Sequence, residues 1–199
     1  MKTKFLVVGD KNGAPYCEFY AYCDDKLVFH TRGTVGRNGV SEDRVEGDGT
    51  TPIGTFKMGK CFGLLHVPES IKMDLGDGKE TEVRMQMPYK VLDEYDYWNG
   101  DFNTAPFNDM VDSREMPESW DAARCEHLID YPVAYNYVSF IGYNKENPVD
   151  GKGSCIFLHC VNLTFTGTAG CVGLPEEYML KALFLINEDT EIEIVRGKE

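Results

Sequence analysis

Short β-type segments separated by turn residues recur along the chain, and only one segment has the periodicity of a helix. Strands are expected at residues 4–8, 16–22, 26–31 and 55–58. The second and third form a hairpin joined across Cys23-Asp24-Asp25, and a loop rich in Gly, Asp and Thr runs from Gly33 to Gly54. Short segments separated by turn residues favour a fold built from sheets over one built from packed helices.

The second half of the chain continues the pattern and contains the helix. Residues 133–143 and 155–160 are rich in β-formers, and residues 191–195 alternate as a last strand should. A helix is expected from Pro175-Glu176-Glu177 to about residue 186, because proline suits the first helical position and acidic residues favour the positive end of the helix dipole. The sequence therefore predicts a mainly β protein with one clear helix.

Residues 93–121 are aromatic and acidic, contain Pro106 and Pro117, and have no clear period. We expect an irregular insertion on the surface of a single domain that spans residues 1–199. A loop of this length in a compact domain is often functional. Tyr97 and Trp98 belong to its aromatic cluster, which either packs the insertion or offers a substrate-binding platform for glycan or peptide.

Charge and composition exclude several functions. The 199 residues carry a net charge of −13, which disfavours binding to nucleic-acid phosphates. No apolar run approaches the roughly 20 residues of a membrane span. The four apolar residues after the basic N-terminus are too few for a signal peptide, so we expect a cytoplasmic protein or a chain whose leader has been removed.

No metal site or cofactor is expected. The seven cysteines include no Cys-x-x-Cys pair, and Asp109, Asp112 and Asp150 lack ligand-like spacing. An odd number of cysteines leaves at least one unpaired. Cys17 and Cys23 either form a bridge or, as we favour, are small reduced core residues.

A histidine and a cysteine form the pattern most suggestive of chemistry. Phe157-Leu158-His159-Cys160 ends an apolar strand, and Thr168-Ala169-Gly170-Cys171 precedes the helix. A thiol becomes a good nucleophile when an imidazole, backbone amides or a helix start lowers its pKa. We expect all three near Cys171, with His159 as base and the amides around Gly170 as oxyanion donors. The alternatives are a core cysteine and a structural histidine; for His127 the structural role is favoured.

The chain resembles the L,D-transpeptidase (YkuD) family over about residues 30–195. Gly47–Phe56 is similar to the family's Gly-Asp-Gly-x-Thr-Pro-x-Gly-x-Phe loop, in which Asp48 suits a turn. His159 and Thr168–Cys171 are similar to its His and Ser/Thr-His-Gly-Cys segment, and Leu128–Tyr135 resembles a segment of one branch. The chain departs from the pattern at Ala169, where the family has His, at Gly173, where Arg is common, and in its short spacer after His159.

The resemblance implies a β-sandwich-like catalytic domain that acts on peptidoglycan. Cys171 would attack the carbonyl after the diamino acid of a tetrapeptide stem and release D-Ala, and the amine of a second stem would then give a 3-3 crosslink. His159 would be the base, oriented by the carbonyl of Cys160, and Thr168 and Ala169 would bind substrate. Carbapenems would acylate Cys171.

The substrate places the expected enzyme outside the membrane, in the periplasm or at the cell wall, and we expect a monomer. Two other functions fit the same residues. One is an L,D-carboxypeptidase that uses water as acceptor. The other is a cell-wall-binding module without catalysis, which the departures at Ala169 and Gly173 favour.

Overall fold

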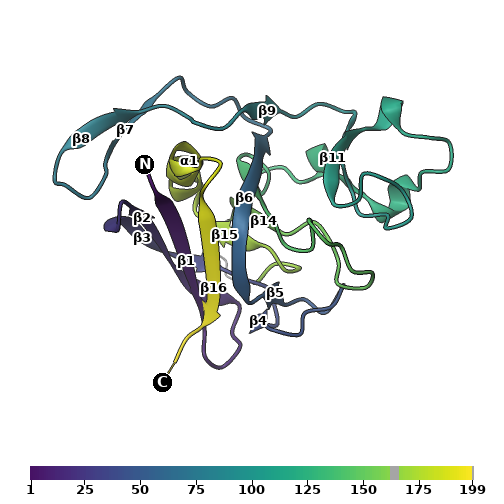
Figure 1. The fold of residues 1–199 in the computed structure, drawn as a ribbon, viewed down its shortest axis with the longest axis horizontal. Coiled ribbons are helices and arrows are strands. Elements are labelled where there is room, and N and C mark those ends of the chain that lie inside the picture. The colour runs from purple at the N-terminus through teal and green to yellow at the C-terminus, as the bar shows by residue number, and fades with distance from the viewer. Residues whose placement is uncertain (162–165, 199) are drawn as a thin grey trace.

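A curled sheet forms the body of the protein in the computed structural model, which describes residues 1–161 and 166–198 (Figure 1). Its nine strands are β1 (Thr3–Gly9), β2 (Tyr16–Cys23), β3 (Lys26–Thr34), β6 (Gly54–Gly63), β9 (Tyr89–Val91), β13 (Val138–Ile141), β14 (Phe157–Cys160), β15 (Val172–Leu174) and β16 (Glu191–Arg196). They follow the order β13-β14-β15-β3-β2-β1-β16-β6-β9, and β13 also pairs with β6. This extra pairing closes the sheet, so that opposite strands face one another across a core.

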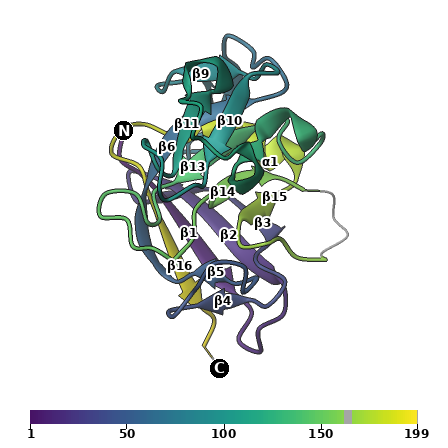
Figure 2. The same ribbon diagram turned by 90° about the vertical axis from the view of Figure 1, so that its right-hand side faces the viewer.

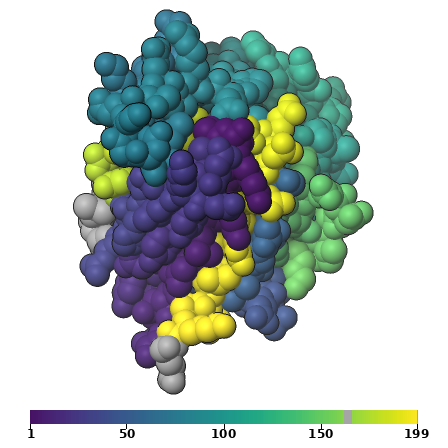
Figure 3. Space-filling model, turned by 60° about the vertical axis from the view of Figure 1, so that its left-hand side comes forward, coloured from purple at the N-terminus to yellow at the C-terminus, as the bar shows by residue number. Residues whose placement is uncertain are grey.

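Alternating buried and exposed side chains explain the first two strands of the chain. Every second residue of β1 and of β2 is buried. β2 and β3 form the predicted hairpin, with Asp24 and Asp25 at positive φ, as two-residue hairpin turns require. β1 pairs in parallel with β16, so the N-terminal and C-terminal strands lie side by side on one face (Figure 3).

The described residues contain one α-helix, α1 (Glu176–Leu185). It begins where the sequence predicts, although Pro175 is the N-cap and not the first helical residue. Met179 and Leu183 of this helix are fully buried in the main core. The predicted mainly β fold with one helix in the C-terminal half is therefore confirmed.

Two apolar clusters lie on opposite faces of β14 and β15. Leu158 and Val172 belong to the main core between the closed sheet and α1. Phe157 and Cys171 point the other way, into a second cluster with the fully buried Trp98. The alternation of side chains along a strand thus places Cys171 at the edge of an apolar surface outside the main core.

Three smaller sheets and three 3-10 helices complete the described structure. The strand pairs are β4 (Val40–Ser41) with β5 (Thr51–Pro52) and β7 (Ile71–Asp74) with β8 (Glu80–Val83). β11 (Asp109–Asp112), β10 (Asp96–Asn99) and β12 (Glu126–His127) form a three-stranded unit, hereafter the small sheet. The 3-10 helices are Ser113–Glu115, Ala122–Arg124 and Leu128–Asp130.

The small sheet corrects the expectation that residues 93–121 are irregular. It lies at the end of the molecule away from β4 and β5 (Figure 2). Its central strand β10 has no apolar alternation because the buried residues Asp96 and Asn99 are polar. Asn99 is satisfied by hydrogen bonds from its side chain to the carbonyls of Thr104 and Pro106, at 2.7 and 2.9 Å.

All seven cysteines are free thiols, and Cys17 and Cys23 are buried. The reduced state favoured for this pair is the one observed. Among residues 1–161 and 166–198, no helix is long and apolar enough to cross a membrane.

Candidate functional site

A cavity of about 750 Å³ opens where three distant parts of the chain meet. The loop between β4 and β5 contributes Arg44, and β12 of the small sheet contributes Glu126. β14 contributes His159, and Cys171 immediately precedes β15. A volume of this size is typical of pockets that bind small molecules or peptides. The spacer residues 162–165 lie outside the described residues.

β14 and β15 bring His159 and Cys171 onto the same face. The two strands pair in parallel, with Leu158 opposite Val172 and His159 opposite Gly173. Because side chains alternate, Cys171 and His159 both point away from the main core and both line the cavity. The predicted nucleophile and base are therefore brought together, although no hydrogen bond joins them within the described part of the chain.

The ring of His159 is oriented by a backbone carbonyl. Its Nδ1 lies 2.7 Å from the carbonyl oxygen of Cys160, which can only accept a hydrogen bond. Nδ1 therefore carries the proton, and Nε2 has a free lone pair. The ring is 7% exposed, and burial lowers its pKa, so it is neutral at pH 7. Cys160 thus stands where the resemblance implies.

The thiol of Cys171 is buried and protonated. Its Sγ accepts a hydrogen bond from the amide of Phe157 at 3.3 Å and donates one to the carbonyl oxygen of Cys155 at 3.2 Å. Burial, and after it the charge of Glu126, raise the thiol pKa to about 12, against the lowering effects of the Phe157 amide and Arg44. The expectation that the surroundings lower this pKa is wrong, because desolvation outweighs the favourable groups.

The helix start is also too distant to activate this thiol. Cys171 immediately precedes β15, and the three residues Val172–Leu174 and Pro175 separate it from α1. Three residues of strand span about 10 Å. The field of a helix terminus is felt within its first turn, so α1 contributes little at Sγ.

The residues before Cys171 form a tight turn. Gly170 has φ +154° and is buried, and a Cβ there would lie 2.9 Å from the carbonyl oxygen of Thr50. Thr168 Oγ1 accepts from the Gly170 amide at 3.1 Å and donates to the Cys171 carbonyl at 2.7 Å. The Gly170 amide is therefore engaged, so Gly170 shapes the turn and does not supply the expected oxyanion donor. Thr168 and the exposed Ala169 line the cavity.

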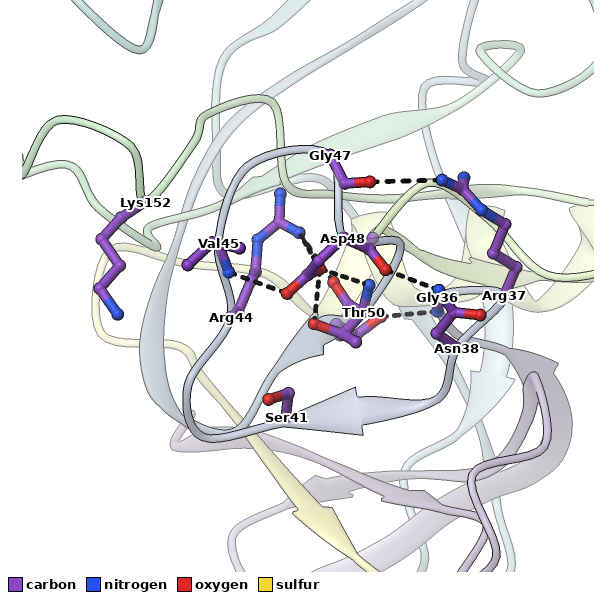
Figure 4. A network of polar contacts seen from close by, with 12 residues as sticks. Gly36, Arg37, Asn38, Ser41, Arg44, Val45, Gly47, Asp48, Thr50 and Lys152 are labelled. Carbon is purple, nitrogen blue, oxygen red and sulfur yellow. Dashed lines mark hydrogen bonds and ion pairs between the residues drawn. The ribbon is translucent and has the colours of Figure 1, made fainter.

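The loop between β4 and β5 packs against this turn. The carboxylate of Asp48 accepts from the amides of Val45 and Thr50, each at 2.8 Å, and is the turn former expected (Figure 4). Burial raises its pKa, but these hydrogen bonds, the Thr50 hydroxyl and the charge of Arg44 together lower it by more. Thr51 Oγ1 lies 3.3 Å from the Cys171 carbonyl and donates to it. The loop therefore fixes the backbone that carries Cys171.

Gly173 departs from the family pattern for a steric reason. A Cβ at this position would lie 2.2 Å from Cγ1 of Val161 and 2.8 Å from Cγ2 of Thr34. A side chain there requires the side chains of Val161 and Thr34 to move.

Of the two roles considered for Tyr97 and Trp98, the structure shows packing and does not place them at the cavity as substrate-binding residues. Trp98 is 0% exposed and stacks in the second cluster, and its Nε1 donates to Asn108 at 2.8 Å. Tyr97 points to the other face of β10, where it stacks on His127 with ring centroids 4.4 Å apart. Neither residue lines the cavity.

His127 is held on both ring nitrogens. Nε2 lies 3.0 Å from the carbonyl oxygen of Glu94, and Nδ1 lies 3.1 Å from Oδ1 of Asp130. It does not line the cavity, so the structural role favoured from the sequence is the one observed.

Sequence reasoning missed three residues of the cavity. Glu126 accepts a hydrogen bond from the hydroxyl of Tyr135 at 2.6 Å, and burial raises the pKa of both groups. Arg44 is a buried cation. The resemblance of residues 128–135 to one branch of the family is a signal for Tyr135, whereas the burial of Arg44 and Glu126 depends on contacts distant in sequence. Within the described residues, no His, Cys, Asp and Glu side chains gather in a group that would hold a metal.

Comparisons with known proteins relate this chain to one protein family. The chain matches no curated protein, but it resembles the solved structure of the Ldtfm-avibactam carbamoyl enzyme, with 14% identity and a TM-score of 0.42 over 100% of this chain. It also resembles a cysteine-to-serine mutant of the Enterococcus faecium L,D-transpeptidase, with 13% identity and a TM-score of 0.41 over 98% of this chain. In each case the chain spans 50% of the solved chain. The family profile of the L,D-transpeptidase catalytic domain, YkuD, matches residues 14–194. This chain therefore belongs to the YkuD family of L,D-transpeptidase catalytic domains.

Proposed function

We propose that this chain is a cysteine-dependent peptidoglycan L,D-transpeptidase with Cys171 as nucleophile and His159 as base. One observation carries the proposal. The bond from Nδ1 of His159 to the Cys160 carbonyl leaves Nε2 free as a proton acceptor, on the same face and in the same cavity as the Cys171 thiol. Family membership supports the same reaction class.

Acylation begins from a neutral pair. Nε2 of His159 takes the proton from Sγ of Cys171 as Sγ attacks the carbonyl after the diamino acid of a tetrapeptide stem. The backbone amide of Cys171 is our candidate donor to the oxygen on which negative charge develops. When the tetrahedral intermediate collapses, the C–N bond breaks, and the imidazolium returns its proton to the amine of the leaving D-alanine. The product is a thioester on Cys171.

The second half reverses these roles. The amine of a second stem attacks the thioester carbonyl and loses its proton to Nε2, and the C–S bond breaks. The resulting thiolate of Cys171 then takes the proton back from the imidazolium. The product is a 3-3 crosslink, and water in place of the amine would give a shortened stem. This substrate implies an enzyme that works outside the membrane, at the cell wall.

Intact-protein mass spectrometry tests the proposal. We expect the wild type, incubated with disaccharide-tetrapeptide, to gain the mass of the stem less D-alanine, and Cys171→Ala to gain nothing. Cys125→Ala is the matched control, because Cys125 also lines the cavity and is more exposed. Crosslinked dimers among the products support transfer, and tripeptide alone supports the hydrolase. An adduct that survives in Cys171→Ala, or a wild type that never acylates, would overturn the assignment.

A further inference from the structure

A buried cation beside the nucleophile has no role in the mechanism above. Arg44 lies on the loop between β4 and β5, is 4% exposed, and lines the cavity (Figure 4). Charged side chains are almost never this buried unless they are paired. The site therefore keeps a positive charge in an otherwise acidic chain.

The partners of Arg44 leave this charge only partly satisfied. Nη1 donates to the carbonyl oxygen of Thr50 at 2.8 Å and lies 3.7 Å from Oδ1 of Asp48. That carboxylate oxygen already accepts from both the amide and the hydroxyl of Thr50. Nε of Arg44 is buried and has no hydrogen-bond partner among residues 1–161 and 166–198. An unpaired buried N–H is rare in folded proteins and points to an absent acceptor.

The guanidinium also lies against the turn that carries the nucleophile. A Cβ on Gly170 would come within 2.8 Å of Nη1, and a Cβ on Gly153 within 3.2 Å of Nη2. Two glycines therefore leave the room that the guanidinium occupies, one of them adjacent to Cys171. The ring of Tyr143 covers the group at 5.6 Å.

A planar cation with a free donor, held beside an acyl-transfer nucleophile, is suited to a carboxylate. We propose that Arg44 binds a carboxylate of the donor stem next to the scissile bond, and so selects donors that carry one. This inference rests on the proposed function. The carboxylate is either the C-terminal group of the leaving D-amino acid or the free carboxylate on the side chain of the diamino acid.

Binding to the inert Cys171→Ala protein tests the proposal without any need for turnover. The probes are three tetrapeptides: one with both carboxylates free, one amidated at the C-terminus, and one amidated on the diamino-acid side chain. One amide should bind roughly 10- to 100-fold more weakly than the free acid, as expected for a charge-assisted pair, and which amide does so identifies the carboxylate. When Arg44→Gln is combined with Cys171→Ala, only the binding of the free acid should weaken, so the preference for it should disappear. Arg44→Lys in the same background should keep part of the preference.

Arg37→Gln is the matched control, because Arg37 lines the same cavity but is exposed. It should leave the preference unchanged. Thermal melting shows whether each variant is folded, and Arg44→Lys remains informative if Arg44→Gln is not. Equal binding of the acid and both amides, or a preference that survives in folded Arg44→Gln, would overturn the proposal. If the wild type is acylated without any carboxylate preference, the role of Arg44 is overturned and the proposed function stands. If binding depends on the carboxylate and Arg44 but no acylation occurs, the role of Arg44 stands and the proposed function is overturned.

Discussion

Burial is the largest influence on the protonation state of Cys171. Because the thiol pKa is about 12 and the imidazole pKa lies below its ordinary 6.5, moving the proton from Sγ to Nε2 before attack is strongly unfavourable. A preformed thiolate–imidazolium pair is therefore scarce. Proton transfer is expected to accompany attack on the substrate, and general-base catalysis by His159 becomes essential.

The alkylation rate of Cys171 should report this protonated state. Well below the thiol pKa, the thiolate fraction rises tenfold with each pH unit. We expect iodoacetamide to label Cys171 slowly at pH 7 and about tenfold faster at pH 8, with peptide mapping to separate it from the other six cysteines. Fast labelling that does not change between pH 6 and 8 would show a preformed thiolate and contradict this picture.

Loss of the base should have a large and specific effect. His159→Gln is expected to slow acylation roughly 10²- to 10⁴-fold, the usual contribution of a positioned base. His127→Gln is the control, since both of its ring nitrogens have structural partners.

The acid limb of the wild-type rate should belong to His159, because protonation removes the lone pair on Nε2. Burial lowers the pKa of this ring, so the rate should stay level as pH falls from 8 to 6.5 and decline only below that. Single-turnover kinetics from pH 4 to 9 measure both effects. A larger loss for His127→Gln than for His159→Gln would move the base to His127.

At the scale of elements, the small sheet supports the nucleophile through Asn108. This residue is fully buried next to β11, and its Oδ1 accepts from Trp98 Nε1 at 2.8 Å and from the Cys155 amide at 3.2 Å. Cys155 has a positive φ of 56°, an uncommon conformation for a residue with a side chain, and its carbonyl accepts the thiol proton of Cys171. Asn108 therefore fixes the backbone against which the resting thiol is held.

Replacing Asn108 should disturb both stability and chemistry. Asn108→Ala leaves two buried N–H groups without their acceptor, which costs about 2–4 kcal/mol of the free energy of unfolding. Acylation should also slow, since Cys155 loses the contact that holds its backbone. Urea unfolding and thioester formation give the two readouts, and Asn12→Ala, on the exposed turn after β1, is the control. A folded variant with wild-type stability would show that the small sheet does not brace this segment.

Particular elements show what the sequence could and could not predict. The β2–β3 hairpin, α1 and β16 follow from local patterns, because apolar alternation, turn residues and an acidic helix start lie within each segment. β15 and β10 were missed for different reasons. β15 consists of only three residues, Val172–Leu174, and forms through its pairing with β14. β10 lacks a recognisable apolar alternation because some of its buried residues are polar.

The candidate site divides in the same way. The sequence predicts that Cys171 and His159 share a site, because the two motifs lie close together in the chain, and both residues line the cavity. Arg44 and Glu126 were not predicted, since only the folded chain brings the β4–β5 loop and the small sheet to the same cavity. The thiol pKa was predicted with the wrong sign, because the depth of burial depends on the second apolar cluster, which residues distant in sequence create.

At the scale of the whole molecule, charged side chains fasten the small sheet to the closed sheet. Asp109 at the start of β11 accepts from Nζ of Lys60 on β6 at 2.5 Å and from Nζ of Lys145, after β13, at 2.9 Å. Burial raises the pKa of this carboxyl, but the two lysines lower it by more, so the net pKa lies below its usual value. The carboxylate therefore links elements that share no strand pairing with β11.

The sign of the resulting pH dependence follows from that lowered pKa. A carboxyl whose pKa is lower in the folded than in the unfolded chain stabilises the fold above the unfolded value, near 4, and this contribution is lost as pH falls through the folded value. Asp109→Asn should lower the free energy of unfolding by about 1 kcal/mol at pH 7, a figure reduced for the partly exposed lysines. The difference from wild type should shrink as pH falls from 5 to 2, where the wild-type carboxyl is itself protonated. Urea unfolding across this range measures it, with the exposed Asp150→Asn as control. If the difference in the free energy of unfolding between the two proteins stays constant down to pH 2, the charge of Asp109 does not fasten the small sheet to the closed sheet.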